Sequence, residues 1–431
     1  MTTRELIASR LEEARIRTLH LLEPLSDEDL RLQHDPLMSP IIWDLGHIAR
    51  FEELWLVRNL EGPIEFSEMP GMYNPFENPR RVRGALQLPT LDECVVLMRE
   101  IRSRVLARMS RVRFDSDNEL LRDGYVYAMV LQHEYQHNET ILQTLQLKQG
   151  APYRAPRAYG RPPSPRVVDH RGVVPFAGGR VRVGTDDRSA AYDNERPQHE
   201  IELAPFSIDA FPVSNGDYLE FMRDGGYRRR ELWSDAGWSW NNEAQVEAPM
   251  YWVRDGDDWC TRVMDNVSSV DVNLPVCHVC YYEAEAFARF AGKRLPTELE
   301  WETAAGWNPR SGSMQAFPWG DEPATPQLAN VDQLSFSTAA RGTYDRNWSP
   351  LGCYGMIGDV WEWTSSDFQP YPGYRTFPYP EYSEMFFGDE YKVLRGGSWA
   401  TRPGAVRNSF RNWDYPIRRQ IFAGFRCARD D

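Results

Sequence analysis

Apolar residues recur at helical spacing along the first third of the chain. Residues 4–22 place them around one apolar face of a predicted helix; they are Leu6, Ile7, Leu11, Ile16, Leu19 and Leu22. Ser39 followed by Pro40 predicts the N-cap and the first turn of a second helix, which we expect to run to about Leu60.

Two further helices are predicted in the same part of the chain. Thr90 and Glu93 have the spacing of a capping box and open the third helix. The fourth helix is expected from about Asn118 to Leu147. Four helices joined by connections of variable length predict a helical bundle as the first domain, residues 1–147.

A proline-rich stretch ends the helical pattern. Residues 148–170 cannot continue a helix and are expected to form an extended linker; their prolines are Pro152, Pro156, Pro162, Pro163 and Pro165. Beyond it, residues 171–431 show short strand-like segments, Gly and Pro turns and most of the 15 tryptophans. This pattern predicts an α+β domain with much loop.

Composition narrows the kinds of partner that we expect. Hydrophobic residues make up 42% of the 431 residues and charged residues 26%, which is typical of a globular protein. The net charge of −14 is spread without a basic stripe, which argues against nucleic acid and favours small-molecule substrates. No apolar run approaches the ~18 residues of a membrane span, and the first residues do not resemble a signal peptide. We therefore expect a cytoplasmic protein with no membrane partner. We also expect a monomer.

One histidine pair has the spacing of metal ligands. His133 and His137 lie at i and i+4 of the predicted fourth helix, on one face and close enough to share a metal ion. The chain has only eight histidines. Two of them at this spacing in a mostly apolar helix favour a metal site over a hydrogen-bonded core or a surface position.

The same segment also has the H-E-x-x-H pattern of zinc metallopeptidases. In that interpretation Glu134 would be the general base. Such peptidases need a third metal ligand downstream. The residues after His137 lack the H-x-x-G-x-x-H extension, so the peptidase interpretation is disfavoured.

The third ligand is better sought on another helix of the bundle. His47 lies in an apolar part of the predicted second helix, with Gly46 beside it to permit close approach. A single helical histidine is more often a core residue, and His20 and His34 are competing candidates. Three neutral imidazoles would leave positions open for a thiolate and O2 on Fe(II), although zinc also fits these ligands.

Five motifs in the second half of the chain resemble one known domain. In order, they are R-L-P-T-E-L-E-W-E (294–302), P-W-G-D (318–321), G-D-V-W-E-W-T (358–364), R-G-G-S-W (395–399) and G-F-R-C (424–427). They resemble the formylglycine-generating-enzyme (sulfatase-modifying-factor) domain, which implies a C-type-lectin-like fold over residues 171–431. That family carries two active-site cysteines just after G-G-S. This chain has T-R-P-G-A-V at 401–406, so formylglycine generation is not expected.

The N-terminal segments extend the resemblance to the whole chain. They are D-P-L-M-S-P (35–40), W-D-L-G-H (43–47) and H-E-Y-Q-H (133–137), and they resemble a DinB-like four-helix bundle. Together the two domains resemble the sulfoxide synthases of ergothioneine biosynthesis. The resemblance implies Fe(2+) on His47, His133 and His137, with Glu134 not a ligand. It also implies an oxidoreductase that joins hercynine (Nα-trimethylhistidine), γ-glutamylcysteine and O2 into γ-glutamyl-hercynylcysteine S-oxide.

The resemblance also implies a binding site for the thiol substrate. N-P-R-R-V-R at 78–83 resembles the P-R-x-x-R segment of the family, so Arg80 and Arg83 would hold carboxylates of γ-glutamylcysteine. Asp414 would bind the amino group of this substrate, and Arg418 a carboxylate. Without the resemblance, residues 78–83 would be interpreted as a solvated basic turn.

Hercynine needs a different kind of site, because its trimethylammonium group favours aromatic faces and polar oxygens. The candidates that the resemblance implies are Gln136, which would reach the imidazole, and Tyr382, Asn412 and Trp413. For Trp413 a plain core position is the competing interpretation.

The family reaction also needs a proton donor, so that the sulfur is not simply dioxygenated. Matching the segment from Tyr371 onward to the family places Tyr379 at the catalytic tyrosine. A phenol stays protonated at neutral pH and can give up a proton or a hydrogen atom during turnover. The loop through Asp389 is shorter than in some relatives, so Tyr374 and Tyr382 are alternative donors.

Several alternatives stay open. The site is expected at the interface of the two domains, with neither half active alone.

An ovothiol-type 5-histidylcysteine sulfoxide synthase would join cysteine to histidine, but such proteins usually carry a methyltransferase domain, and this sequence ends at Asp431. Free cysteine is an alternative thiol, and Arg80 and Arg83 favour γ-glutamylcysteine over it. A non-catalytic lectin-like module would consume no O2. Calcium sites in the second domain are left open.

Overall fold

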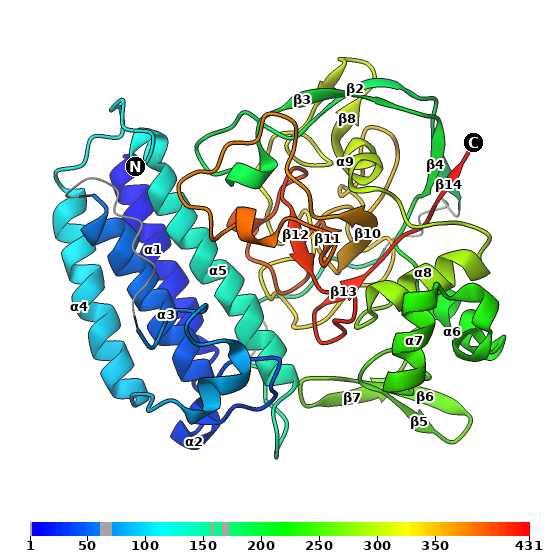
Figure 1. The fold of residues 1–431 in the computed structure, drawn as a ribbon, viewed down its shortest axis with the longest axis horizontal. Helices are drawn as coiled ribbons and strands as arrows, with labels where there is room; N and C mark the ends of the chain where they lie inside the picture. The colour runs from blue at the N-terminus through cyan, green and yellow to red at the C-terminus, as the bar shows by residue number, and fades with distance from the viewer. Residues whose placement is uncertain (1, 61–70, 157–158, 166–171) are drawn as a thin grey trace. The chain divides into compact units, whose positions relative to one another are not determined.

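The computed structural model describes residues 2–60, 71–156, 159–165 and 172–431, and the chain forms two compact units (Figure 1). The first, here called the helical unit, comprises Met1–Arg157 and Asp187–Ala190. The second, the mixed unit, comprises Ala158–Asp186 and Ala191–Asp431. Within the described ranges, no helix is both long and apolar enough to span a bilayer.

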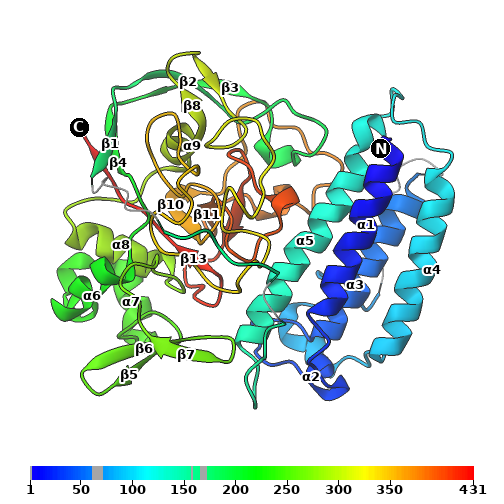
Figure 2. The same ribbon diagram turned by 180° about the vertical axis from the view of Figure 1, so that it is seen from behind.

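The helical unit is the predicted four-helix bundle. Its long helices are α1 (Thr3–His20), α3 (Ile41–Glu53), α4 (Leu91–Met109) and α5 (Tyr125–Gln146). Helix α1 packs on α5, and α3 packs on both α4 and α5, as Figures 1 and 2 show from opposite sides. Shorter elements connect them: α2 (Asp27–Arg31), the π-helical turn η1 (Leu54–Arg58), and the 3-10 helices η2 (Arg80–Ala85) and η3 (Arg122–Gly124).

The predicted start of α4 is confirmed, and the predicted start of α3 is wrong. Thr90 and Glu93 form the expected reciprocal capping box. At α3, however, Pro40 is the N-cap and makes no side-chain capping bond. The hydroxyl of Ser39 instead accepts a hydrogen bond from Nη1 of Arg83 at 2.6 Å, so a long-range donor replaces the local one.

The fourth helix begins seven residues later than Asn118, which had been expected to open it. Asp123 and Gly124 have φ angles of 56° and 81°, and this left-handed backbone separates the preceding turns from α5 at Tyr125. Asn118 accepts a hydrogen bond from the backbone N–H of Leu120 at 2.9 Å, as turn residues commonly do. Helix α2 was missed because five residues are too few to show a helical period.

Only part of the predicted linker lies within the described residues. Residues 148–156 and 159–165 contain no helix or strand, as expected, whereas residues 157–158 and 166–171 lie outside the described residues. The hydroxyl of Tyr153 donates a hydrogen bond to the carbonyl of Leu21 at 2.8 Å. The first part of this stretch is therefore attached to the helical unit.

The mixed unit is built from small sheets and short helices, as an α+β domain. Its largest sheet has the strand order β12-β11-β10-β13, in which β10 is antiparallel to β11 and parallel to β13. The strands of this sheet are β10 (Trp361–Asp367), β11 (Lys392–Arg395), β12 (Asn412–Asp414) and β13 (Ala423–Gly424). The helices are α6 (Asn215–Arg223), α7 (Asp235–Ala244), α8 (Tyr281–Phe290) and α9 (Glu298–Gly306).

The remaining strands form four smaller sheets, with the orders β1-β4-β14, β2-β3, β5-β6-β7 and β8-β9. Their bounds are β1 (Val173–Phe176), β2 (Gly179–Val183), β3 (His199–Leu203), β4 (Phe206–Asp209), β5 (Trp252–Asp255), β6 (Asp258–Val263), β7 (Asn266–Ser269), β8 (Trp307–Asn308), β9 (Ser313–Met314) and β14 (Ala428–Asp430). The 3-10 turns are η4 (Asp193–Glu195), η5 (Gly226–Arg228), η6 (Arg230–Leu232), η7 (Glu384–Phe386) and η8 (Pro403–Ala405).

The C-terminal motifs meet in buried ion pairs. Arg426 is fully buried against Glu362 at 2.6 Å, and the indole of Trp301 donates to the same carboxylate at 2.8 Å. Arg395 is likewise buried against Glu302 at 2.6 Å. A buried charge needs such a partner, so these motif residues act together in the core of the mixed unit.

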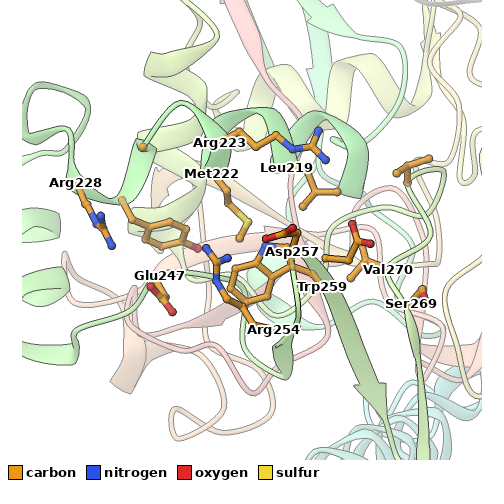
Figure 3. Close-up of a pocket in the computed structure, with 14 residues that line it drawn as sticks. Leu219, Met222, Arg223, Arg228, Glu247, Arg254, Asp257, Trp259, Ser269 and Val270 are labelled. Atoms are coloured by element: carbon orange, nitrogen blue, oxygen red, sulfur yellow. The ribbon is translucent and has the colours of Figure 1, made fainter.

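A cavity of about 590 Å³ lies in the mixed unit between α6 and the β5-β6-β7 sheet (Figure 3). Charged side chains of both signs line it, including Arg223, Arg254, Glu247 and Asp257. The guanidinium of Arg254 lies over the ring of Trp259 at 5.0 Å. The residues predicted to bind substrate or metal are not among those that line this cavity.

The core of the helical unit contains a network of four buried charges, one from each long helix. Arg15 of α1 contacts Glu52 of α3 at 2.8 Å and Glu134 of α5 at 3.0 Å. Arg102 of α4 contacts Glu52 at 2.6 Å and Glu134 at 3.8 Å. All four side chains are buried, and their formal charges cancel. Each of the four long helices is thus tied to two others by charge.

We expect Glu134→Gln to destabilise the protein by about 3–5 kcal/mol, because the two buried arginines then share the single carboxylate of Glu52 and one buried positive charge is left uncompensated. Urea unfolding followed by circular dichroism measures this change. As a control, Asp115→Asn removes an exposed partner of Arg113 and should leave the unfolding midpoint unchanged. An unchanged midpoint for Glu134→Gln would contradict the structural role of the network.

Candidate metal centre

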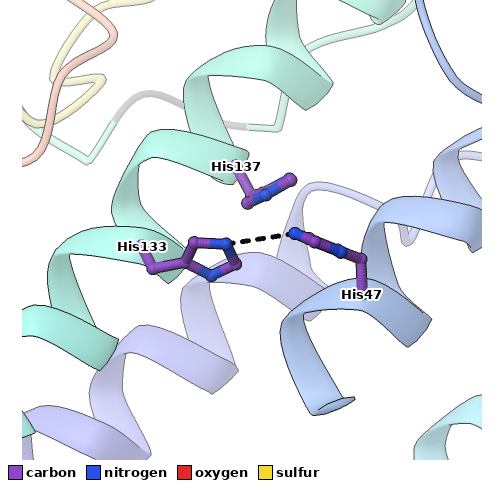
Figure 4. Close-up of side chains that lie close together, drawn as sticks. All are labelled: His47, His133 and His137. Atoms are coloured by element: carbon purple, nitrogen blue, oxygen red, sulfur yellow. Dashed lines mark hydrogen bonds between the residues drawn. The ribbon is translucent and has the colours of Figure 1, made fainter. Parts of the chain in front are cut away.

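Three imidazoles from two helices converge in the helical unit (Figure 4). His47 comes from α3, and His133 and His137 come from α5. One ring nitrogen of each lies within 4.8 Å of the others, and in the described part of the chain no other three His, Cys, Asp or Glu side chains do so. Nε2 of His47 lies 3.2 Å from Nε2 of His133. Two imidazoles about 2.1 Å from one metal ion and at right angles would have their nitrogens about 3.0 Å apart, so the spacing fits a metal ion.

The orientation of His47 depends on a main-chain atom. Its Nδ1 lies 2.9 Å from the carbonyl oxygen of Tyr73 and donates to it, which leaves Nε2 as the metal donor. Gly46 makes this approach feasible, because a Cβ there would lie 2.1 Å from the ring of Tyr73. The close approach predicted at Gly46 is confirmed. The indole of Trp43 also stacks on His47, with centroids 4.9 Å apart.

The orientation of His137 depends on a carboxylate. Nδ1 of His137 lies 3.1 Å from Oδ1 of Asp44, which is 1% exposed and precedes His47 by three residues on α3. Accepting the Nδ1 proton directs Nε2 of His137 toward the other two rings. A carboxylate partner of this kind also raises the basicity of a ligating imidazole.

Burial keeps two of the imidazoles neutral. It lowers the pKa of His47 and of His133 well below the ordinary value, and the charge of a protonated His137 would lower both further. The ring of Phe51 stacks on His133 with centroids 3.7 Å apart. Neutral imidazoles have the free lone pairs that metal ions require, so the site is suited to a cation at neutral pH.

Glu134 is not part of this site. Its Oε1 accepts hydrogen bonds from Nε of Arg15 at 3.0 Å and from the hydroxyl of Thr18 at 2.8 Å. Burial opposes its ionisation, but the charges of Arg15 and Arg102 and the hydrogen bonds together lower its pKa. A carboxylate held in this way is a poor general base, which argues against the peptidase interpretation.

The two competing histidines, His34 and His20, make other contacts. His34 is buried, with Nε2 3.0 Å from the carbonyl of Asp29 and Nδ1 accepting the backbone N–H of Gln149 at 3.2 Å. His20 pairs with Glu23 at 3.1 Å near the surface. Neither belongs to the cluster of ring nitrogens.

The two arginines predicted for the thiol substrate have different environments. The side chain of Arg80 is exposed, whereas Arg83 is 5% exposed and stacks on Trp43 at 3.5 Å. Burial lowers the pKa of Arg83 to about 10, and the nearby charge of Asp44 opposes this shift. Gln136 lies on the same face of α5 as His133, three residues further along the helix.

The candidates in the mixed unit form an aromatic cluster beside an ion pair. Tyr382 meets Trp413 edge-on at 5.7 Å and Tyr379 at 6.4 Å. Asn412, Trp413 and Asp414 make up β12, the edge strand of the largest sheet. Oδ1 of Asp414 lies 3.3 Å from Nε of Arg418. The structure therefore brings these predicted residues together within the unit.

Three residues that belong to these arrangements were missed from the sequence. Asp44 had a signal, because it lies one helical turn from His47 on the same face. Tyr73 contributes a carbonyl, which no side-chain pattern reveals. Tyr192 stacks on Tyr382 with centroids 4.0 Å apart but lies in no recognised motif.

Two family models match the chain. The "DinB superfamily" model matches residues 10–141. The "Sulfatase-modifying factor enzyme 1-like domain" model matches residues 160–431. Both expected fold families are therefore confirmed.

Curated relatives match over the whole length. The chain is 42% identical to "Hercynine oxygenase" of Mycobacterium tuberculosis, over 100% of both chains. It is 43% identical to "Hercynine oxygenase" of Mycolicibacterium thermoresistibile, over 98% of this chain and 94% of the relative. A "Formylglycine-generating enzyme" of Thermomonospora curvata is 33% identical over 60% of this chain and 94% of its own.

We expect Asp44→Ala to weaken Co(II) binding about 10- to 100-fold, because His137 loses the carboxylate that orients it. Asp44→Asn should fall between this variant and the wild type, since its amide oxygen still accepts the Nδ1 proton. Competition with a chelator, followed by the Co(II) absorption bands, measures the affinity.

The matched control is Glu53→Gln, which removes a buried carboxylate of the same helix that pairs with Arg50 and Arg104. It should lower stability and leave Co(II) affinity unchanged. Wild-type affinity in Asp44→Ala would refute the role of Asp44.

Proposed function

Because the chain belongs to the hercynine oxygenase family and is therefore an oxygenase, we propose that it joins hercynine to γ-glutamylcysteine as an iron-dependent sulfoxide synthase. The observation that carries this proposal is the identity of about 42% over the full length of a hercynine oxygenase, across both units. A relative with only one unit would not support a reaction that draws on residues of both.

The proposed reaction balances with O2 as the only oxidant. The imidazole of hercynine loses a C–H hydrogen and the thiol loses its S–H hydrogen as the C–S bond forms. One oxygen atom ends in the sulfoxide, and the other leaves as water with the two hydrogens. O2 thus accepts four electrons, two from bond formation and two from oxidation of the sulfur.

We propose that His47, His133 and His137 hold iron(II). Three imidazole ligands leave further coordination positions open on the metal ion. Iron(II) would accept both a thiolate and O2 at such positions. Iron would supply the redox chemistry that zinc lacks. The protein supplies the fixed donor geometry, through the carbonyl of Tyr73 and the carboxylate of Asp44.

For the thiol substrate we propose Arg80, Arg83, Asp414 and Arg418. Nη1 of Arg418 is buried and has no hydrogen-bond partner among the described residues, so a substrate carboxylate would satisfy it. Asp414 carries the opposite charge beside it and suits an amino group. Arg83 is already fixed by Trp43 and Ser39, so it would lose little side-chain entropy on binding.

For hercynine we propose Trp413, Tyr382, Asn412 and Gln136. Aromatic faces attract a quaternary ammonium, and Tyr382 and Trp413 meet at an edge-on angle of 81°. The amides of Asn412 and Gln136 offer both donors and acceptors to an imidazole or a carboxylate.

We propose Tyr379 as the proton donor. It is partly buried and belongs to the same aromatic cluster as Tyr382. One of the two alternative donors, Tyr374, donates its hydroxyl hydrogen to Oδ2 of Asp193 at 2.9 Å. Burial raises the pKa of Tyr374, and the neighbouring Asp193 raises it further, which makes this phenol a poorer donor.

The proposal is tested by O2 uptake of the full-length protein loaded anaerobically with iron(II). We expect uptake that requires hercynine and γ-glutamylcysteine together, with one joined sulfoxide formed per O2, read by mass spectrometry. Parallel reactions replace γ-glutamylcysteine by cysteine, and hercynine by histidine. Faster turnover with either replacement would overturn the substrate assignment. No O2 uptake with any pair, together with one zinc per chain, would overturn the function.

Tyr379→Phe removes the proposed donor while keeping the ring. We expect the joined product to fall at least about 100-fold while the thiol is oxidised to its sulfinic acid by O2. Product masses give the ratio. Tyr391→Phe is the control, because Tyr391 donates its hydroxyl hydrogen to the hydroxyl oxygen of Tyr415 and has no proposed role. An unchanged product ratio in Tyr379→Phe would exclude this tyrosine as the donor.

A further inference from the structure

The segment that carries Tyr379 has no regular structure of its own. Between Tyr374 and Ser383 the backbone forms turns and irregular stretches, with no helix or strand. Such a segment has no backbone ladder to order it, so its conformation depends on hydrogen bonds and packing from elsewhere in the fold.

One buried carboxylate provides these hydrogen bonds. Asp193, which is 1% exposed and opens η4, accepts the hydroxyl hydrogen of Tyr374 on Oδ2 at 2.9 Å. The same oxygen accepts the backbone N–H of Phe377 at 3.1 Å, and Oδ1 accepts the hydroxyl hydrogen of Ser383. Asp193 therefore holds both ends of the segment and one backbone group between them.

The residues on either side of Asp193 add to this attachment. Asn194 donates its amide hydrogen to the hydroxyl of Ser383 at 3.0 Å. Tyr192 stacks on Tyr382 with centroids 4.0 Å apart and an interplanar angle of 19°. Three consecutive residues thus hold the segment from Tyr374 to Ser383, and only Asp193 accepts several of its hydrogens.

We propose that Asp193 is a positioning residue that fixes the phenol of Tyr379 for proton donation. This inference rests on the proposed role of Tyr379. Asp193 has no proposed contact with substrate or metal and acts through the segment that it holds. Proton transfer needs heavy atoms within hydrogen-bond reach, and a displacement of about 1 Å can cost about 100-fold in rate.

The test is Asp193→Asn, which keeps the size of the side chain. Its amide nitrogen cannot accept a hydrogen bond, so the hydrogens now received on two oxygens compete for one. We expect the joined sulfoxide to fall at least about tenfold in kcat, with a matching rise in the sulfinic acid of the thiol. The KM for γ-glutamylcysteine and the Co(II) absorption bands should stay as in the wild type.

Asp359→Asn is the matched control. Asp359 is half-buried, and its Oδ1 accepts hydrogens from the side-chain amide of Asn330 and from the backbone N–H of Ala339, both at 2.7 Å. Its φ of 63° is one that asparagine adopts readily. This variant loses a carboxylate that likewise accepts side-chain and backbone hydrogens, elsewhere in the mixed unit, and should keep the wild-type product ratio. The same product change in both variants would refute a specific role for Asp193.

Hydrogen exchange separates this inference from the proposed function. Asp193→Asn should speed the exchange of backbone amides in residues 374–383 and leave α9 unchanged. If the wild type makes no joined product but this exchange rises, the proposed function fails and the attachment of the segment stands. Wild-type exchange and wild-type product ratio in a folded Asp193→Asn protein would overturn the inference. If Asp193→Asn does not fold, Ser383→Ala removes one donor, and the same two readouts decide.

Discussion

The four buried charges of the helical unit fix how its long helices are placed against one another, and with them the histidines that the helices carry. An unpaired buried charge is far more costly than a paired one, so sliding one helix by a turn would be penalised by the loss of its partners. Glu134 belongs to this network and directly follows His133, so the contact with Arg15 at 3.0 Å also determines which face of α5 carries the histidines. Glu52 similarly fixes α3, on which His47 lies five residues earlier.

This dependence explains what could be predicted of the metal centre. The i, i+4 spacing of His133 and His137 is a local pattern, and the sequence revealed it without any knowledge of the fold. His47 lies 86 residues away from His133. Its apolar setting and the neighbouring Gly46 made it a candidate, but His20 and His34 stayed in competition until the family resemblance was considered. The carbonyl of Tyr73 leaves no trace in a side-chain pattern.

The helix ends also show that a local sequence pattern predicts only what local contacts decide. Thr90 and Glu93 cap α4 as predicted, because a capping box is complete within four residues. Ser39 had an equally good local signal, but the prediction that it caps α3 was wrong. Its hydroxyl instead accepts a hydrogen bond from Arg83, 44 residues further along the chain. In the mixed unit the motifs predicted the fold by resemblance. Their physical role, as arginines buried against glutamates such as Arg426 and Glu362, required the structure.

The two units meet different demands by different means. A metal ion needs donors held within a few tenths of an ångström, and rigid helices locked by buried charges provide such precision. In the reaction that we propose, the donor Tyr379 must instead approach a changing substrate, and an irregular segment permits that where a strand would not. Irregularity alone would leave the phenol too mobile, so a few side-chain hydrogen bonds at the ends of the segment limit its motion. Asp193 has the burial and the acceptors for that task, and its distance of 184 residues from Phe377 explains why no sequence pattern pointed to it.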